Sequence, residues 1–133
     1  MIGKSLLHYE IHAKIGKGGM AVVYRALQES LDRPVAIKQL KEEYAGDEVI
    51  TERFQREALS VASFQHENIV HVYDIGEVDG RVYFTMEYID GEDLGVLMRR
   101  IGRLPQDKGI EVARQLCLGL AALHDRGLLH RDL

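Results

Sequence analysis

Residues 15–40 read IGKGGMAVVYRALQESLDRPVAIKQL, and this stretch limits the folds that the chain can adopt. Gly16, Gly18 and Gly19 let the backbone approach a phosphate closely, although glycines at this spacing are equally typical of a tight hairpin turn. A dinucleotide-binding fingerprint or a P-loop would have to open a helix whose N-terminus faces the phosphates. Residues 22–27 instead continue as a strand. The stretch therefore predicts a glycine-rich hairpin over a ligand and excludes both of those folds.

The segment VAIK at 35–38 predicts the next strand, which starts just after the turn Asp32-Arg33-Pro34. Side chains alternate along a strand, so Ala36 and Lys38 share one face. On that face the lysine is placed to meet a phosphate, and the small alanine leaves room for a flat ring. The alternative is an exposed strand lysine, which is the commoner interpretation of a single lysine.

Residues 48–65 change to a helical period and carry a carboxylate on an apolar stripe. At 100° per residue, four large apolar side chains fall together: Ile50, Phe54, Val61 and Phe64. Glu57 falls on the same stripe, where burial of its charge is costly unless a cation meets it. We expect Lys38 to be that cation. The alternative is that Glu57 lies at the edge of the stripe and reaches water.

The remaining pattern predicts an α+β chain of five strands, one inserted helix and two later helices. Strands are expected over 8–15, 22–27, 35–40, 69–77 and 81–89, and helices over 48–65, 92–101 and 106–125. Asp79-Gly80 is a strong signal for a two-residue hairpin between the last two strands. The last helix has a broad apolar face, on which Cys117 and His124 are expected to be packed. Only eight residues follow Asp125 in this sequence, and we do not expect them to cover that face.

Composition narrows the possible partners. The 133 residues contain 17 Lys and Arg against 21 Asp and Glu, and the absence of a basic cluster argues against general nucleic-acid binding. A single cysteine excludes an internal disulfide framework and suits a reducing compartment. No apolar run approaches the roughly 20 residues of a membrane helix, and residues 1–10 do not read as a signal peptide. We therefore expect a cytoplasmic chain with no membrane segment of its own.

Taken in order, these motifs resemble those of the eukaryotic-type protein kinases, in the form common among bacterial serine/threonine kinases. IGKGGMAVVY resembles the glycine-rich loop, with Ala21 where many members have a third glycine, and VAIK resembles the third strand. Glu57 in FQREA resembles the helix-C glutamate. Three further segments resemble the stretch after helix C, the fifth strand with the hinge, and the start of the catalytic loop: HENIV (66–70), FTMEYIDGEDL (84–94) and LHRDL (129–133).

The resemblance implies a partial protein kinase domain over 1–133. Residues 1–89 would form the small lobe and hinge, with a five-stranded antiparallel sheet and helix C. Residues 90–133 would form the start of the large lobe, truncated in the catalytic loop. The implied function is ATP-dependent phosphoryl transfer to Ser or Thr of a protein substrate, as part of a full kinase domain.

The resemblance also implies a role for individual residues. Lys38, held by Glu57, would meet the α- and β-phosphates, and Asp132 would accept the proton of the substrate hydroxyl, with His130 and Arg131 positioning that loop. Val23 and Ala36 would sandwich adenine, Met86 would be the gatekeeper, and backbone groups of Glu87 and Ile89 would bond the adenine edge. The implied ATP-binding residues are Ile15, Gly16, Lys17, Gly18, Gly19, Met20, Ala21, Val22, Val23, Ala36, Lys38, Met86, Glu87 and Ile89.

The chain departs from the family pattern after HRD. The family domain is about twice as long and continues with a lysine, a metal-binding asparagine, DFG and an activation loop. Its Mg²⁺ ligands would therefore lie beyond this chain, and no metal ligand is expected within it. Asp74-Ile75-Gly76 mimics DFG but precedes HRD. Two alternatives follow: a catalytically inactive module that binds nucleotide or pairs with another kinase through its small lobe, and a truncated product that folds poorly.

Overall fold

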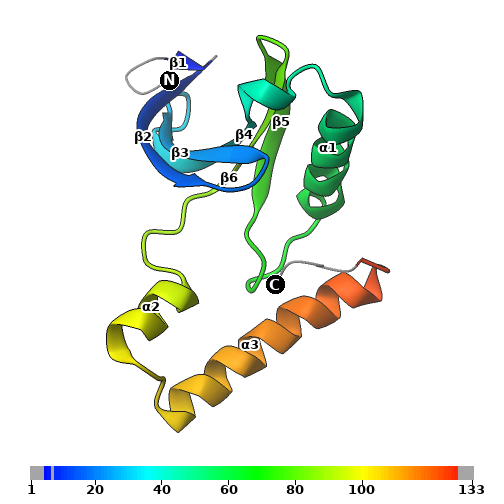
Figure 1. The fold of residues 1–133 in the computed structure, drawn as a ribbon. Helices are drawn as coiled ribbons and strands as arrows, with labels where there is room; N and C mark the ends of the chain where they lie inside the picture. The colour runs from blue at the N-terminus through cyan, green and yellow to red at the C-terminus, as the bar shows by residue number, and fades with distance from the viewer. Residues whose placement is uncertain (1–4, 7, 129–133) are drawn as a thin grey trace. The chain divides into compact units, whose positions relative to one another are not determined.

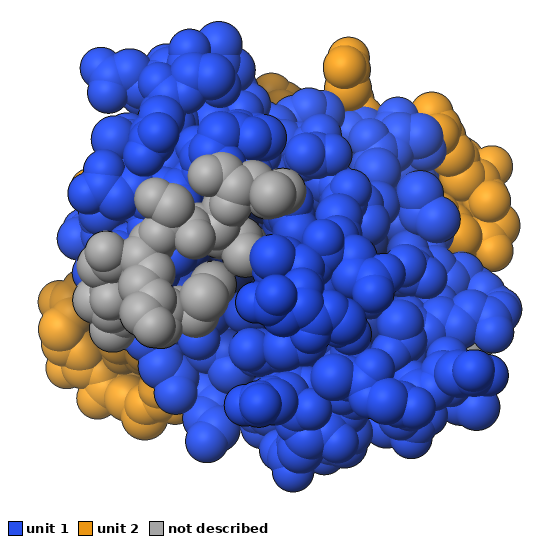
Figure 2. All heavy atoms as spheres, turned by 90° about the horizontal axis from the view of Figure 1, so that it is seen from above, with its two compact units in different colours: residues 1–64, 70–88 blue, residues 65–69, 89–133 orange. Residues whose placement is uncertain are grey.

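The computed structural model describes residues 5–6 and 8–128 (Figure 1). The chain divides into two compact units, which Figure 2 shows in different colours. Unit 1 comprises residues 1–64 and 70–88, and unit 2 comprises residues 65–69 and 89–133. No helix among the described residues is both long enough and apolar enough to cross a membrane.

Unit 1 is an antiparallel sheet with one α-helix against it. The strands are β1 (Ser5–Leu6), β2 (Tyr9–Lys17), β3 (Ala21–Gln28), β4 (Arg33–Leu40), β5 (Val72–Val78) and β6 (Arg81–Glu87). Their order in the sheet is β1-β2-β3-β4-β6-β5. The α+β class and the five expected strands are confirmed. The two-residue β1 is an addition that the sequence pattern did not indicate, because so short a segment carries no periodicity.

The turns of the sheet follow their sequence chemistry. Asp79 and Gly80 both have positive φ, 51° and 73°, as a two-residue turn of the type I′ kind requires. The predicted hairpin between β5 and β6 is thus confirmed. Asp32, in the turn between β3 and β4, also has a positive φ of 49°, a conformation that aspartate tolerates better than most residues.

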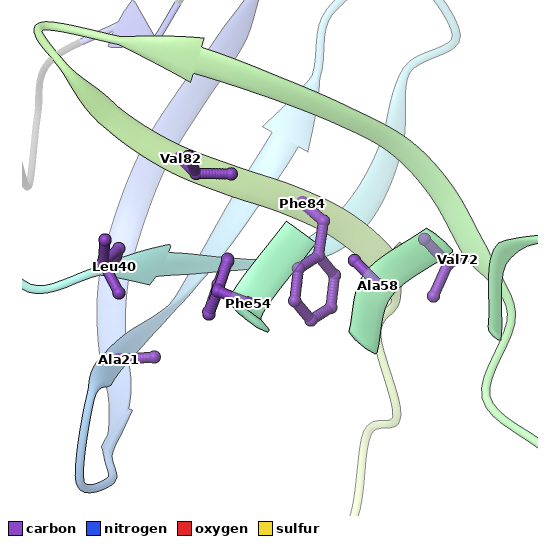
Figure 3. Close-up of a cluster of buried hydrophobic side chains, with 7 residues drawn as sticks. All are labelled: Ala21, Leu40, Phe54, Ala58, Val72, Val82 and Phe84. Carbon is purple, nitrogen blue, oxygen red and sulfur yellow. The ribbon is translucent and has the colours of Figure 1, made fainter. Parts of the chain in front are cut away.

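Helix α1 (Glu48–Ala62) follows β4 and a short 3-10 turn, η1 (Glu42–Tyr44). The Asp47 side chain begins it by accepting hydrogen bonds from the amides of Val49 and Ile50, at 3.0 and 3.1 Å. Phe54 and Ala58 are its buried residues. Figure 3 shows them facing the sheet within a cluster that also contains Ala21, Leu40, Val72, Val82 and Phe84. The rings of Phe54 and Phe84 lie 5.3 Å apart, a favourable aromatic separation.

A second apolar cluster lies on the opposite face of the sheet. It consists of Tyr9, Ile11, Ala26, Val35, Ile37 and Tyr83. On β4, Val35 and Ile37 belong to this cluster while Leu40 belongs to the first, as the alternation of side chains along a strand requires. The central strands β4 and β6 are therefore buried on both faces.

Unit 2 contains α2 (Leu94–Ile101) and α3 (Gln106–Asp125). The bounds of α3 are the predicted ones, and Asp93 caps α2 by accepting from the Val96 amide at 2.7 Å. Residues 65–69 pack on α3 at Gly119, where a Cβ atom would stand 3.1 Å from the Asn68 carbonyl oxygen. Gly119 is the one buried residue among the described part of this unit.

The predicted apolar face of α3 exists, but much of it is exposed. Ile110 is 61% and Leu116 42% exposed, and Cys117 and His124 are exposed as well. The expectation that Cys117 and His124 are packed is therefore wrong. A helical period shows which side chains share a face but not whether another element covers that face.

Candidate functional site

The register of four strands brings several predicted site residues into two rows. Val23 of β3 lies opposite Gly16 of β2 on one side and Lys38 of β4 on the other, and Lys38 lies opposite Phe84 of β6. Residues directly opposite each other in an antiparallel pair project from the same face of the sheet. In the adjacent row, Ala36 lies opposite Met86. This face is the one that carries α1 and the cluster of Figure 3.

Three of the predicted residues depart from this arrangement, and one of them, Lys17, lies opposite Val22 and shares its face. Val22 is 7% exposed and lies opposite Gln39 rather than Lys38, so its side chain projects from the other face. Ile15 falls where the register between β2 and β3 shifts, between the pairs Lys14–Tyr24 and Gly16–Val23. Its side chain is 48% exposed. Such bulges re-aim a side chain and are common next to functional sites.

The hairpin between β2 and β3 ends in an open tip. The Gly18 N–H donates to the Ala21 carbonyl at 3.0 Å. Lys17, Gly18 and Gly19 are exposed, whereas Met20 packs against the cluster beneath α1. Lys41, the first residue after β4, donates from Nζ to the Gly19 carbonyl at 2.8 Å. The sequence pattern does not single out Lys41, because a lysine after a strand carries no signal of a partner 22 positions earlier.

Lys38 is half-buried, and its Nζ lies 5.7 Å from the centroid of the Phe84 ring, within the range of a cation–π contact. Among the described residues its ammonium makes no ion pair, and Glu57 makes none either. The expected pair between Lys38 and Glu57 is therefore not formed in this structure.

Glu57 is exposed because of the way α1 is turned on the sheet. The predicted stripe is confirmed at Phe54, which is 4% exposed, but α1 ends at Ala62, so Phe64, which is 5% exposed, lies beyond the helix. Ala58, however, is buried at 1%, so the face against the sheet runs through Phe54 and Ala58. Glu57 lies about 100° around the helix from Ala58 and reaches water. Of the two interpretations of Glu57, the structure shows the one in which its side chain lies at the edge of the apolar stripe and reaches water.

Glu87, the residue after Met86, is held by His71, which directly precedes β5. The Glu87 N–H donates to the His71 carbonyl at 2.8 Å, and the Glu87 carboxylate accepts from the His71 N–H at 3.3 Å. The Glu87 amide is thus engaged within unit 1. Ile89 belongs to unit 2, where it is 59% exposed.

The predicted catalytic-loop residues His130, Arg131 and Asp132 lie outside the described residues. Within residues 5–6 and 8–128, no group of three or more His, Cys, Asp or Glu side chains is placed to hold a metal ion. Asp74 lies in β5, and its carboxylate accepts from the neighbouring Ile75 amide at 2.9 Å.

A curled antiparallel sheet with a glycine-rich hairpin, a lysine in its third long strand and one helix inserted before the last two strands defines the small lobe of a protein kinase. The family model for the protein kinase domain matches residues 9–133, and the chain belongs to that family.

Known relatives and structures agree with this assignment. Serine/threonine-protein kinase PrkC of Bacillus subtilis is 41% identical over 134 residues, covering 100% of this chain and 21% of PrkC. PknL of Mycobacterium tuberculosis is 42% identical over 125 residues, covering 94% of this chain and 31% of PknL. The crystal structure of the Mycobacterium tuberculosis PknI kinase domain is similar with a TM-score of 0.82 and 32% identity, covering 98% of this chain and 54% of that one. The chain thus spans about a fifth to a third of these curated relatives.

Proposed function

We propose that this chain forms the ATP-binding half of a serine/threonine protein kinase, which transfers a phosphoryl group from ATP to a hydroxyl of a protein substrate. The observation that carries the proposal is the row Gly16–Val23–Lys38, which places the hairpin, an apolar side chain and an ammonium on one face of the sheet. PrkC and PknL, named as serine/threonine kinases, support the choice of substrate hydroxyl.

The residues present suit a nucleotide. Ala36 is buried opposite Met86, which gives a small apolar surface for a flat ring. Lys38 lies two residues further along the same face of β4, so its ammonium would meet the α- and β-phosphates. The exposed tip at Gly18 and Gly19 would cover those phosphates with backbone N–H groups. Bound ATP would supply the phosphoryl group, and Mg²⁺ would neutralise its charge; we assign no magnesium ligand within this chain.

We further propose that residues 1–89 act as small lobe and hinge and residues 90–133 as the start of the large lobe. Asp132 would orient the substrate hydroxyl and accept its proton, with His130 and Arg131 positioning that loop. Glu57 would hold Lys38 in the catalytic arrangement, which requires α1 to turn its exposed carboxylate toward β4. A cytoplasmic location suits both the single cysteine and an ATP-dependent reaction.

Substitution of Lys38 tests the proposal. In the natural polypeptide that contains this chain, Lys38→Met should lower phosphoryl transfer to a protein substrate by about 100-fold or more, because the nucleotide phosphates lose a preorganised cation. Transfer of labelled γ-phosphate is the measurement. Lys14→Met is the matched control, since Lys14 is an exposed lysine on β2, which is separated from β4 by β3 in the same sheet. Undiminished transfer by Lys38→Met would overturn the assignment.

A second candidate function is binding without catalysis, through pairing of two small lobes. Helix α1 exposes two large apolar side chains, Val49 at 76% and Leu59 at 62%, and their burial would contribute to such pairing. Light scattering of the purified chain distinguishes a pair of chains from a monomer. A mass near twice 15.1 kDa supports pairing, and a mass near 15.1 kDa at high concentration contradicts it.

A further inference from the structure

At Gly18 and Gly19 the tip of the glycine hairpin is not held in place by packing, whereas Met20 packs against the cluster beneath α1. Apart from their chain neighbours, no described residue has an atom within 4 Å of the position that a Cβ would take at Gly18 or Gly19. Both residues are exposed and lack side chains. The conformation of the tip at these two glycines therefore depends on its hydrogen bonds.

Lys41 supplies two of these bonds from outside the hairpin. The last register pair between β3 and β4 is Ala21–Leu40. The Lys41 N–H extends this ladder by donating to the Met20 carbonyl at 2.9 Å. The Lys41 ammonium reaches one residue further and donates to the Gly19 carbonyl at 2.8 Å. One residue thus holds two successive carbonyls of the tip, and the bond from its side chain is strengthened by a full charge.

These bonds fix the directions of two amides. The described peptides are trans, so each N–H points away from the C=O of the same peptide group. The bond at the Gly19 carbonyl therefore sets the direction of the Met20 N–H, and the bond at the Met20 carbonyl sets that of the Ala21 N–H. Both amides belong to the tip that would lie over a nucleotide.

We propose that Lys41 is a positioning residue for nucleotide binding, acting through the conformation of the hairpin tip rather than by contact with phosphate. The proposal rests on the proposed function, in which this hairpin covers the phosphates of ATP. In this role Lys41 differs from Lys38, whose side chain belongs to the row that would face the nucleotide.

The test compares Lys41→Met, which removes the side-chain donor, with Lys41→Arg, which keeps one, and with Lys14→Met. Two measurements are made on the full chain: hydrogen exchange of the peptide spanning residues 15–24 without nucleotide, and the dissociation constant of AMP-PNP. Loss of the bond in Lys41→Met should speed exchange in this peptide by about fivefold and weaken AMP-PNP binding by a similar factor. Lys41→Arg should restore most of both, and Lys14→Met should change neither.

The two measurements separate the possible failures. Weaker AMP-PNP binding with unchanged exchange would overturn the proposal in favour of direct contact between Lys41 and phosphate. Unchanged exchange and unchanged binding would overturn it as well. If the unaltered chain does not bind AMP-PNP, the proposed function is wrong. The hydrogen-exchange measurement alone then decides whether Lys41 orders the hairpin. Far-UV circular dichroism of each variant confirms that the fold is retained.

Discussion

Tyr83 in β6 shows how one residue depends on its cross-strand neighbour. It is 1% exposed and lies opposite Gly76 of β5, where a Cβ atom would stand 2.6 Å from the Tyr83 hydroxyl oxygen. The glycine therefore makes room for the ring, which closes the second apolar cluster over β5. Packing in the sheet therefore explains why a glycine stands at position 76, independently of the likeness of Asp74-Ile75-Gly76 to the DFG motif.

The environment of Tyr83 predicts a loss of stability at alkaline pH. Burial, followed by the Asp74 carboxylate and Tyr9, raises the pKa of Tyr83 above its ordinary value of 10.0. In the unfolded chain Tyr83 ionises first, so its stabilising contribution is complete below about pH 10 and is lost as the pH rises through the folded-state pKa. Urea unfolding at about pH 8 and about pH 11 should show a smaller decrease in Tyr83→Phe than in the unaltered chain. Equal decreases would contradict this explanation.

At the scale of the element, α1 depends on its first turn. The Asp47 carboxylate satisfies two amides that have no partner within the helix, and it lies at the positive end of the helix dipole. This end is exposed, so little packing assists it. The stability of α1 matters for function because this helix carries Glu57 as well as Phe54 of the main cluster.

Asp47→Ala should lower the free energy of unfolding by about 1 kcal/mol, since this is the usual cost of losing an N-cap side chain. Asp47→Asn retains an oxygen acceptor and should cost much less. Urea unfolding followed by tyrosine fluorescence measures both, because Tyr44 and the sheet tyrosines report on unit 1. An equal loss in the two variants would show that the charge, and not the cap geometry, stabilises the helix.

At the scale of the whole molecule, the two units differ in how much they bury. Unit 1 contains both apolar clusters. In unit 2, Gly119 is the one buried residue among those described, and large apolar side chains of α2 and α3 are exposed, including Leu94, Ile101 and Ile110. Local stability follows the number of buried apolar contacts, so unit 2 should be the less stable unit.

This difference predicts two separate thermal transitions. All six tyrosines lie in unit 1, whereas helix content is greater in unit 2, with 8 and 20 residues in α2 and α3 against 15 in α1. On heating, the circular dichroism signal at 222 nm should therefore begin to decrease at a lower temperature than the one at which the tyrosine signal begins to change. Coincident curves from the two probes would instead show a single cooperative unit.

The longer strands and helices of this protein, and their order, could be predicted from local sequence, whereas the two-residue β1 could not. Local periodicity and turn chemistry predicted the glycine hairpin, the strand at VAIK, the turn at Asp79-Gly80 and the bounds of α3, because each depends on residues near one another in the chain. The likeness to protein kinases rested on the same local motifs, and the family match over residues 9–133 confirms it.

Tertiary structure alone decided the partners of individual side chains. The rotation of α1 buries Ala58 and exposes Glu57, which leaves Lys38 beside Phe84 without its expected carboxylate. The bond from Lys41 to Gly19 joins residues 22 positions apart, and the exposure of Cys117 depends on what covers α3. The periodicity of apolar residues in the sequence shows which residues share a face. Only packing between distant segments determines how that face is oriented and which atoms contact it.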